Sequence, residues 1–325
     1  MFAQLSAFHL RKTFALLLSA AVLCLPALAG ARTAPSQSGS LQYIALPLER
    51  SPQNHLLVRA EINGKPAVLT VDTGAPISAI ALNRRAHFKM LPVAGKSGIP
   101  SRLSINGAFN AVVIARNLRL GALNLVDEPM VVVDLGGLRS PSRSKHRDVD
   151  GILGADILFP TKAILDCRRQ LLILKLNPTV PGRIPGIDYR GYRAVPMHVS
   201  QGFNLYVDGS LNGKKAKLMV DTGAFATLLN TGFVRRMKIP LRDTPYRSSG
   251  VNLGHRGVQV ATISRFSVGS MDMRSNDVGV MNMDGLIHDG LLDATPPVAG
   301  LLGAEILRRY HAIIDFGTNT LYLKK

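Results

Sequence analysis

The sequence contains no tryptophan and only two cysteines, and aromatic residues make up 6% of it. Two cysteines, Cys24 and Cys167, cannot supply a framework of several disulfides, a cysteine-rich zinc site or a run of cluster-binding ligands. The eight histidines are scattered, without the His-Glu-x-x-His or His-x-His spacing of a metal site. Neither a glycine-rich phosphate loop nor a Gly-x-Ser-x-Gly motif is present. We therefore expect no metal and no cofactor.

Acidic residues are also scarce, with 21 Asp and Glu against 39 Lys and Arg, and the formal net charge is +18. A basic protein can bind nucleic acid or lie beside other anionic surfaces. The absence of tryptophan and the low aromatic content leave few side chains to stack on bases, so we expect no nucleic-acid partner. The 325 residues are 46% hydrophobic, which is enough for two domains that each have a core.

The first 29 residues have the pattern of a secretory signal peptide. Arg11 and Lys12 precede an apolar run from Phe14 to Leu25, and Ala27-Leu28-Ala29 follows as a cleavage signal. The alternative is an uncleaved membrane anchor, but the run is shorter than the ~20 residues that span a bilayer. We therefore expect export, to the periplasm or, as an alternative, to the medium. Cleavage leaves Cys167 alone, without an internal disulfide.

An internal repeat determines the organisation. Val71-Asp72-Thr73-Gly74-Ala75 recurs 149 residues later as Val220-Asp221-Thr222-Gly223-Ala224. Three more blocks share this offset, namely 62–65 with 211–214, 151–158 with 300–307, and 163–166 with 312–315. The chain is therefore expected to hold two copies of one lobe, residues 30–177 and 192–325, joined by a Pro- and Gly-rich linker at 178–191.

Within each copy the local signals are mainly those of β-strands. Asn63-Gly64 and Asn212-Gly213 are two-residue hairpin signals between short apolar or alternating runs. Residues 155–159 and 304–309 are the candidate helices, about one short helix per copy. The expected fold is mainly β, with two tandem closed β-barrel lobes that form a single-chain pseudo-dimer.

The repeated Asp-Thr-Gly follows an apolar strand in each copy. Two carboxyl groups held close together, here Asp72 and Asp221, cannot both ionise, so the pair supplies an acid and a base at once. A duplicated lobe brings such a pair together across a pseudo-two-fold interface. Gly74 and Gly223 permit a tight turn, and short hydroxyls beside them can hydrogen-bond across it. A single copy would instead be read as an ordinary hairpin loop.

These motifs resemble those of the retropepsin-like aspartic proteases, particularly exported bacterial members. The resemblance covers both Asp-Thr-Gly-Ala loops, the hydroxyl residues Ser78 and Thr227, the elements 152–154 and 301–303, and the closing strands at 163–166 and 312–315. It implies a bilobal β-barrel protein in which Asp72 and Asp221 share the nucleophilic water and the two threonines Thr73 and Thr222 brace the loops. The implied substrate is a polypeptide in extended conformation.

The chain departs from the retroviral pattern at two places in each copy. Pro76 and Phe225 replace the acidic residue after Asp-Thr-Gly-Ala, and Ala155 and Ala304 replace the arginine after the apolar-apolar-Gly element. Pro76 has no N–H, so a backbone hydrogen bond to substrate is lost on one side only. We therefore expect an asymmetric site, with Pro76, Phe225 and Tyr246 as candidate substrate contacts.

Two segments are candidate flaps over the substrate, residues 95–110 and 246–257, and the alternative is that both are ordinary surface loops. Ala75 and Ala224 stand where pepsin-like relatives commonly have a hydroxyl that stabilises the ionised carboxylate. Its loss should raise the pKa values of the pair, so we expect an activity optimum less acidic than that of gastric-type enzymes. Four basic residues, Arg139, Arg143, Lys145 and Arg147, form either a solvated loop or a contact to an anionic envelope surface or substrate segment.

The hypothesis that follows is an exported, single-chain aspartic endopeptidase that acts as a monomer with pseudo-two-fold symmetry. The main alternative is a non-catalytic module whose bilobal groove grips an extended peptide or another envelope ligand. A third possibility is that each lobe pairs with a lobe of another chain in a larger oligomer. The intact Asp-Thr-Gly in both copies favours catalysis, because a pure binder needs neither carboxylate.

Overall fold

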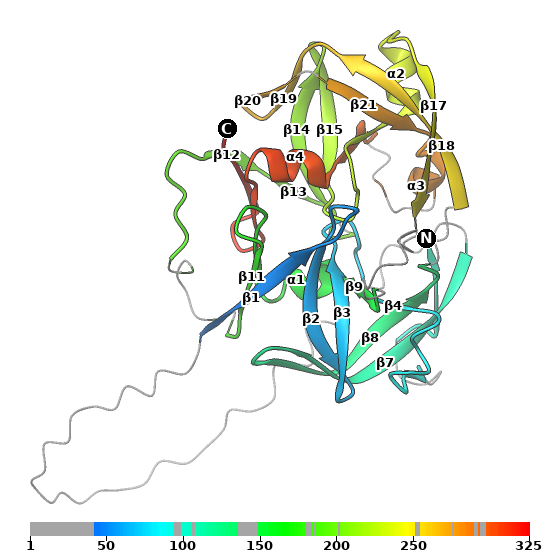
Figure 1. Cartoon of the computed structure of the whole chain (residues 1–325), viewed down its shortest axis with the longest axis vertical. Coiled ribbons are helices and arrows are strands. Elements are labelled where there is room, and N and C mark those ends of the chain that lie inside the picture. The colour runs from blue at the N-terminus through cyan, green and yellow to red at the C-terminus, as the bar shows by residue number, and fades with distance from the viewer. Residues whose placement is uncertain are drawn as a thin grey trace, which may run out of the picture. The chain divides into compact units, whose positions relative to one another are not determined.

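The computed structural model describes residues 42–93, 99–105, 108–135, 149–177, 179, 184, 186–200, 202–250, 254–274, 276–288, 292 and 297–325 (Figure 1). The expected signal peptide at 1–29 and the basic residues Arg139, Arg143, Lys145 and Arg147 lie outside these ranges, as do parts of the linker and of both flap segments. Among the helices described, none is long and apolar enough to cross a membrane.

The first copy consists almost entirely of strands. Its elements are β1 (Tyr43–Arg50), β2 (Leu56–Ile62), β3 (Lys65–Val71), β4 (Ala79–Ala81), β5 (Leu91–Pro92), β6 (Arg102–Ile105), β7 (Ala108–Leu120), β8 (Leu123–Val133), β9 (Gly151–Leu153), α1 (Ala155–Leu158), β10 (Ile164–Asp166) and β11 (Leu171–Lys175).

The second copy repeats this order and adds two short helices, α2 and α3. Its elements are β12 (Arg193–Pro196), β13 (His198–Val199), β14 (Leu205–Leu211), β15 (Lys214–Val220), β16 (Leu228–Asn230), α2 (Thr231–Arg236), β17 (Arg242–Gly250), β18 (Gly254–Ile263), β19 (Phe266–Val268), β20 (Met271–Met273), β21 (Asn276–Met281), α3 (Asp284–His288), β22 (Gly300–Leu302), α4 (Ala304–Arg309), β23 (Ile313–Asp315) and β24 (Thr320–Leu323).

Six strands of the first copy close into a barrel. The order is β2-β3-β9-β4-β8-β7, and β7 returns to pair with β2 through Ile62 opposite Leu118. The two-residue turn between β2 and β3 has positive φ at both Asn63 and Gly64, 50° and 77°, as the hairpin signal predicts. Alternate residues along β2 and β7 are buried, so their apolar side chains fill the barrel.

The second copy follows the same order, β14-β15-β22-β16-β21-β18, and differs where the strand that corresponds to β7 is interrupted. β18 ends at Ile263, and β19 begins at Phe266 and pairs back to β14. The strand that corresponds to β7 is therefore split in two here. The described residues of this copy include six buried methionines, at 197, 219, 271, 273, 281 and 283.

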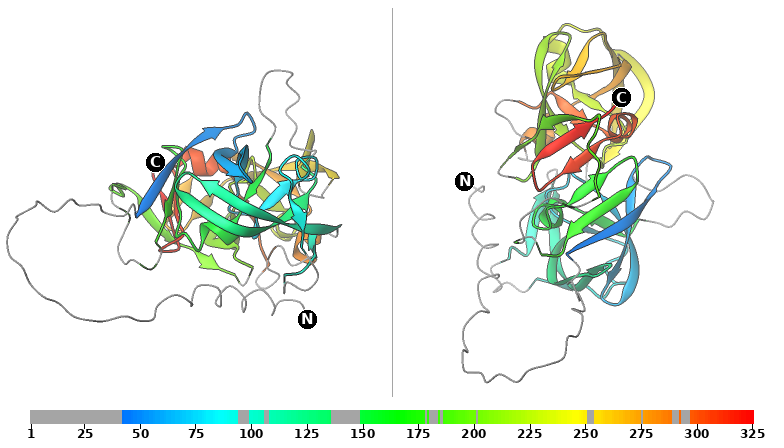
Figure 2. Two further views of the ribbon diagram at one scale, coloured as in Figure 1. Left: turned by 90° about the horizontal axis from the view of Figure 1, so that it is seen from below. Right: turned by 90° about the vertical axis from the view of Figure 1, so that its left-hand side faces the viewer.

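A separate antiparallel layer joins the copies. Its order is β12-β24-β23-β10-β11-β1, and β10 pairs with β23 so that Leu165 lies opposite Ile314, its equivalent 149 residues later. Buried apolar residues of both copies form one continuous cluster. In the right-hand view of Figure 2 the green and red strands of this layer lie between the blue-to-cyan strands of the first copy and the yellow-to-orange strands of the second.

The flap segments form hairpins in the described part of each copy. β6 pairs with the start of β7, and β17 pairs with β18. The tips, at 106–107 and 251–253, lie outside the described residues. That either hairpin covers a substrate stays a prediction.

Candidate functional site

The two Asp-Thr-Gly loops leave the barrels at equivalent points. Asp72 follows β3 and Asp221 follows β15. The Asp72 N–H donates to the carbonyl of Leu153 at 3.0 Å, and the Asp221 N–H donates to that of Leu302 at 3.1 Å. Each aspartate is thus held by the parallel strand beside it, β9 or β22, which is why the apolar-apolar-Gly element recurs with the loop.

Thr73 and Thr222 lock the two loops together. The Thr222 Oγ1 accepts from the Thr73 N–H at 3.0 Å and donates to the Val71 carbonyl at 2.8 Å. The Thr73 Oγ1 does the same in reverse, accepting from the Thr222 N–H at 3.1 Å and donating to the Val220 carbonyl at 2.7 Å. Both side chains are buried, with 1% exposure each. Four reciprocal hydrogen bonds therefore fix the loops of the two copies against each other.

The glycines of the loops leave room for the opposite carboxyl group. A Cβ on Gly74 would lie 2.6 Å from Cγ and Oδ1 of Asp221, closer than real side-chain contacts. A Cβ on Gly223 would overlap the carboxyl group of Asp72 in the same way. Each carboxyl group thus occupies the space that a side chain on the loop glycine of the other copy would fill. The two acids therefore meet at the pseudo-two-fold axis that relates the copies.

Backbone N–H groups bind both carboxylates, but unequally. The Gly74 N–H donates to Asp72 Oδ1 at 2.8 Å. The Gly223 and Ala224 N–H groups both donate to Asp221 Oδ1, at 2.8 and 3.0 Å. Ala75 and Ala224 contribute only backbone here, since alanine has no hydroxyl to offer the carboxylates.

Burial raises the pKa of both aspartates. Desolvation is the largest cause for Asp72, and it is opposed by the Gly74 N–H and by the nearby His55. Desolvation also raises the pKa of Asp221, well above its usual value, and the charge of Asp72 raises it further. The two groups are hydrogen-bonded to each other. The pair therefore holds one proton between its two apparent pKa values.

The helices α1 and α4 support the loops from behind. The Ala155 N–H donates to the Ala75 carbonyl at 2.8 Å, and the Ala304 N–H donates to the Ala224 carbonyl at 2.9 Å. The hydroxyls of Ser78 and Thr227 accept from the N–H groups of Gly154 and Gly303, both at 3.0 Å. Ala155 and Ala304 are fully or almost fully buried, and a small apolar side chain suits such positions.

A second pair of acids, Asp156 and Glu128, lies behind the first loop. Asp156 accepts from the Ser78 N–H at 2.8 Å and from the Ser78 hydroxyl at 2.7 Å. Burial raises the pKa of Asp156 to about 6, and burial together with the charge of Asp156 raises the pKa of Glu128 to about 7. This pair could not be predicted from the sequence, because Glu128 on β8 and Asp156 on α1 are distant along the chain.

Asp156→Asn should flatten the dependence of stability on pH. Both acids bind protons more tightly in the folded chain than in the unfolded one, so they favour folding below about pH 4, and this contribution is lost as the pH rises through about 4 to 7. The amide oxygen can still accept from Ser78. We expect the loss of unfolding free energy between pH 4 and 8 to shrink by about 1 to 3 kcal/mol, measured by urea denaturation.

The control for this change is Asp127→Asn, since Asp127 is the exposed neighbour of Glu128 and asparagine tolerates its positive φ of 54°. The control should keep the pH dependence of the parent chain. Equal pH dependence in the parent and in Asp156→Asn would contradict the prediction.

The candidate substrate contacts differ in exposure. Pro76 is half-buried directly after the first loop, whereas Phe225 is 59% exposed directly after the second. Tyr246 is 72% exposed on β17, and Phe109, which the sequence analysis did not select, is 68% exposed on β7. The residue directly after the loop is thus a half-buried proline in the first copy and an exposed phenylalanine in the second. Each flap hairpin also carries one of these exposed aromatic residues.

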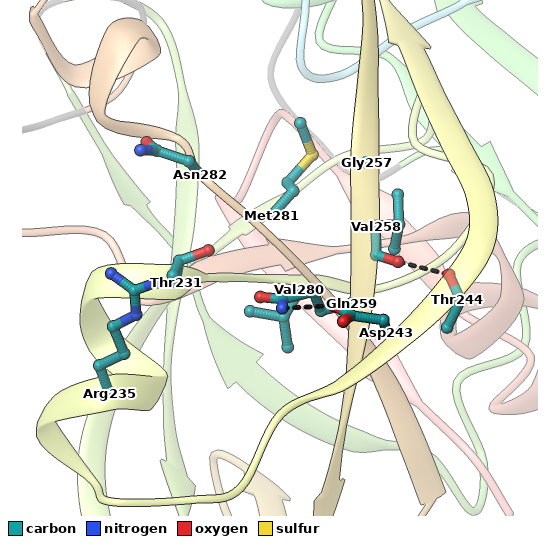
Figure 3. Close-up of a pocket in the computed structure, with 10 residues that line it drawn as sticks. All are labelled: Thr231, Arg235, Asp243, Thr244, Gly257, Val258, Gln259, Val280, Met281 and Asn282. Atoms are coloured by element: carbon teal, nitrogen blue, oxygen red, sulfur yellow. Dashed lines mark hydrogen bonds between the residues drawn. The ribbon is translucent and has the colours of Figure 1, made fainter.

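A pocket of about 400 Å³ lies elsewhere in the second copy, between α2, β17, β18 and β21 (Figure 3). It is lined by residues such as Thr231, Arg235 and Gln259, and none of its lining residues is a predicted site residue. Within the described ranges, no group of three or more His, Cys, Asp or Glu side chains could hold a metal ion.

Comparison with known proteins places this geometry in a family. A family model described as aspartyl protease matches residues 58–157 and 207–306, which is more than half of the chain and one match in each copy. The chain is also similar to the crystal structure of an aspartic proteinase from Irpex lacteus, with a TM-score of 0.50 and 14% identity over 87% of this chain and 97% of that one. No curated protein matches the chain. With the retropepsin-like loop repeated in register in both lobes, the chain belongs to the aspartyl protease family.

Proposed function

We propose that the chain is an exported aspartic endopeptidase that hydrolyses peptide bonds with a water molecule shared by Asp72 and Asp221. The observation that carries this proposal is the reciprocal seating of the two carboxyl groups, each beside the loop glycine of the other copy. A protein that only binds peptides has no need to bury two acids against each other. Their burial and mutual contact keep a single proton on the pair, which is the state that acid–base hydrolysis requires.

In the proposed reaction the ionised carboxylate of the pair removes a proton from the water as the water oxygen attacks the peptide carbonyl carbon. The protonated acid of the pair gives its proton to the carbonyl oxygen, and a neutral tetrahedral diol forms. Collapse of the diol breaks the C–N bond, with a proton passed to the leaving amine and the diol proton returned to the pair.

The proposed substrate is a polypeptide in extended conformation. Two hairpins with exposed aromatic residues, β6–β7 with Phe109 and β17–β18 with Tyr246, suit main-chain pairing and apolar side-chain contacts to such a segment. Pro76 offers no N–H next to the first loop, whereas Phe225 keeps one next to the second. We therefore propose that the two sides of the site bind the substrate differently.

The proposed setting is the periplasm, or the medium as an alternative, because residues 1–29 have the pattern of a signal peptide. The net charge of +18 suits a neighbourhood of anionic envelope surfaces. We propose a monomer, since one chain supplies both Asp-Thr-Gly loops and pairs β10 with β23 within itself. A second function, a non-catalytic peptide-binding module, would use the same groove without hydrolysis.

The experiment that tests this function is incubation of the purified chain with an unstructured peptide library from pH 2 to 8, with the products read by mass spectrometry. We expect internal cleavage, with an optimum less acidic than that of gastric-type enzymes because both acids have raised pKa values. A peptide analogue with a hydroxyl-bearing tetrahedral carbon should inhibit it, because it resembles the diol. Peptide binding without cleavage at any pH would favour the binding module, and an optimum near pH 2 would contradict the expected pH dependence.

A further inference from the structure

The pocket in the second copy lies at the base of the β17–β18 hairpin (Figure 3). Its volume of about 400 Å³ is within the range of small-molecule sites. One wall belongs to the hairpin, through residues 243–244 and 257–259, and the other belongs to α2 and to the end of β21. A ligand in this pocket would therefore contact the hairpin and the barrel at the same time.

The hairpin has a bulge at this wall. The register of β17 against β18 shifts between Asp243 and Arg247, so that residues 244–246 stand opposite a single residue, Val258. The Thr244 hydroxyl donates to the Val258 carbonyl across the bulge. Bulges interrupt the ladder and re-aim side chains, and they are frequent next to functional sites. The irregular part of the hairpin is thus the part that lines the pocket.

Arg235 supplies a positive charge to the opposite wall. Thr231 and Arg235 are four residues apart on α2 and lie on the same face of it, and both line the pocket. Arg235 is exposed, and among the described residues no acidic side chain pairs with its guanidinium. The guanidinium carbon of the adjacent Arg236 lies instead 5.9 Å from the centre of the Phe233 ring. The charge of Arg235 is therefore available to an anionic group of a ligand.

Asp243 supplies a negative charge on the hairpin side. Gln259 Nε2 donates to Asp243 Oδ1 at 2.8 Å, and a carboxylate has further lone pairs for a second donor. The neighbouring cation, Arg242, is paired with Asp277 instead. Figure 3 shows Asp243 beside Gln259 on one side of the pocket and Arg235 on the other. The pocket thus presents opposite charges across its width.

The floor between these charges is apolar. Val280 and Met281, at the end of β21, line the pocket and are buried, with 0% and 4% exposure. Ligand sites commonly combine such an apolar surface with a few polar groups that fix the orientation of the ligand. Here the polar groups suit a small molecule with a carboxylate at one end and an ammonium group at the other.

We propose that this pocket is a second binding site, which takes a small zwitterion, namely a free amino acid or a short peptide. The Arg235 guanidinium binds the carboxylate of the ligand, and the Asp243 carboxylate binds its ammonium group. The ligand then bridges α2 and the bulged strand β17. This inference goes beyond the proposed function and does not depend on it, because no lining residue belongs to the acid pair or its loops.

The test is isothermal titration calorimetry of the full-length chain at pH 7 with alanine, Ala-Ala and Ala-Ala-Ala. The probe that binds most tightly identifies the ligand as an amino acid or a short peptide. For that probe, N-acetylation and C-terminal amidation should each weaken binding by about tenfold or more, because each removes one of the two charges. Arg235→Gln and Asp243→Asn should weaken it similarly, whereas Arg236→Gln, which changes an exposed residue outside the pocket, should not.

A second measurement locates the site in the parent chain, without any variant. With ¹³C-labelled methionine methyl groups, the probe should shift the NMR resonance of Met281, which lines the pocket, and not that of Met271, which is buried on β20. Failure of all three probes to bind would overturn the proposal, as would binding that leaves Met281 unmoved. Equal affinity of the parent chain, Arg235→Gln and Asp243→Asn would also overturn it. Binding at Met281 in a chain that cleaves no peptide would support this site and count against the proposed function alone.

Discussion

Asp72→Asn and Asp221→Asn should each lower kcat/KM on an unstructured peptide by about 10³-fold or more. Asparagine has the size of aspartate but cannot exchange a proton, so either change removes the acid or the base of the pair. The measurement is cleavage by each purified variant across pH 3 to 8. Both variants should fold, because replacing one of two repelling buried acids by an amide relieves desolvation and repulsion.

The control is Asp272→Asn, which changes an exposed aspartate on β20 and should leave the rate within about twofold of the parent chain. Equal cleavage by the parent and by both site variants would refute the assigned pair. Loss of activity in one variant alone would show that the two acids do not act as a unit.

Thr73→Val and Thr222→Val should each lower the unfolding free energy by about 2 to 5 kcal/mol. Valine has the shape of threonine but leaves two buried backbone groups without partners, one N–H in the opposite loop and one carbonyl at Val220 or Val71. Each orphaned group costs about 1 to 3 kcal/mol. Guanidinium denaturation followed by circular dichroism measures the loss.

Serine supplies the matched control at both positions, because Thr73→Ser and Thr222→Ser keep the hydroxyl and should retain most of the stability. The double valine variant should lose less than the sum of the single losses, since all four bonds belong to one network. Losses below about 0.5 kcal/mol for both valine variants would mean that the loops are not held by these hydroxyls.

The sequence alone predicts the two lobes and their meeting loops, because a motif repeated 149 residues later must occupy the same place in each copy. The sequence also predicts that strands are present, because hairpin signals such as Asn63-Gly64 depend only on neighbouring residues. The interruption between β18 and β19 was not predictable, because it depends on how the second barrel closes onto β14.

The acid pair Asp72 and Asp221 was predictable because each residue is part of a recognisable motif. Glu128 was not, because its raised pKa depends on burial and on the charge of Asp156, which is distant in the sequence.

The pairing of β10 with β23 has a consequence for the order of folding. Leu165 meets Ile314 across 149 residues of intervening chain, so this contact carries a high entropic cost of closure and forms late. The first barrel can close beforehand, because β2 to β9 pair among themselves. While the second barrel is still forming, Asp72 has no partner acid. Under the proposed function, a chain in this state holds only one of the two acids that hydrolysis requires, so we expect it not to cut itself or its neighbours before folding is complete.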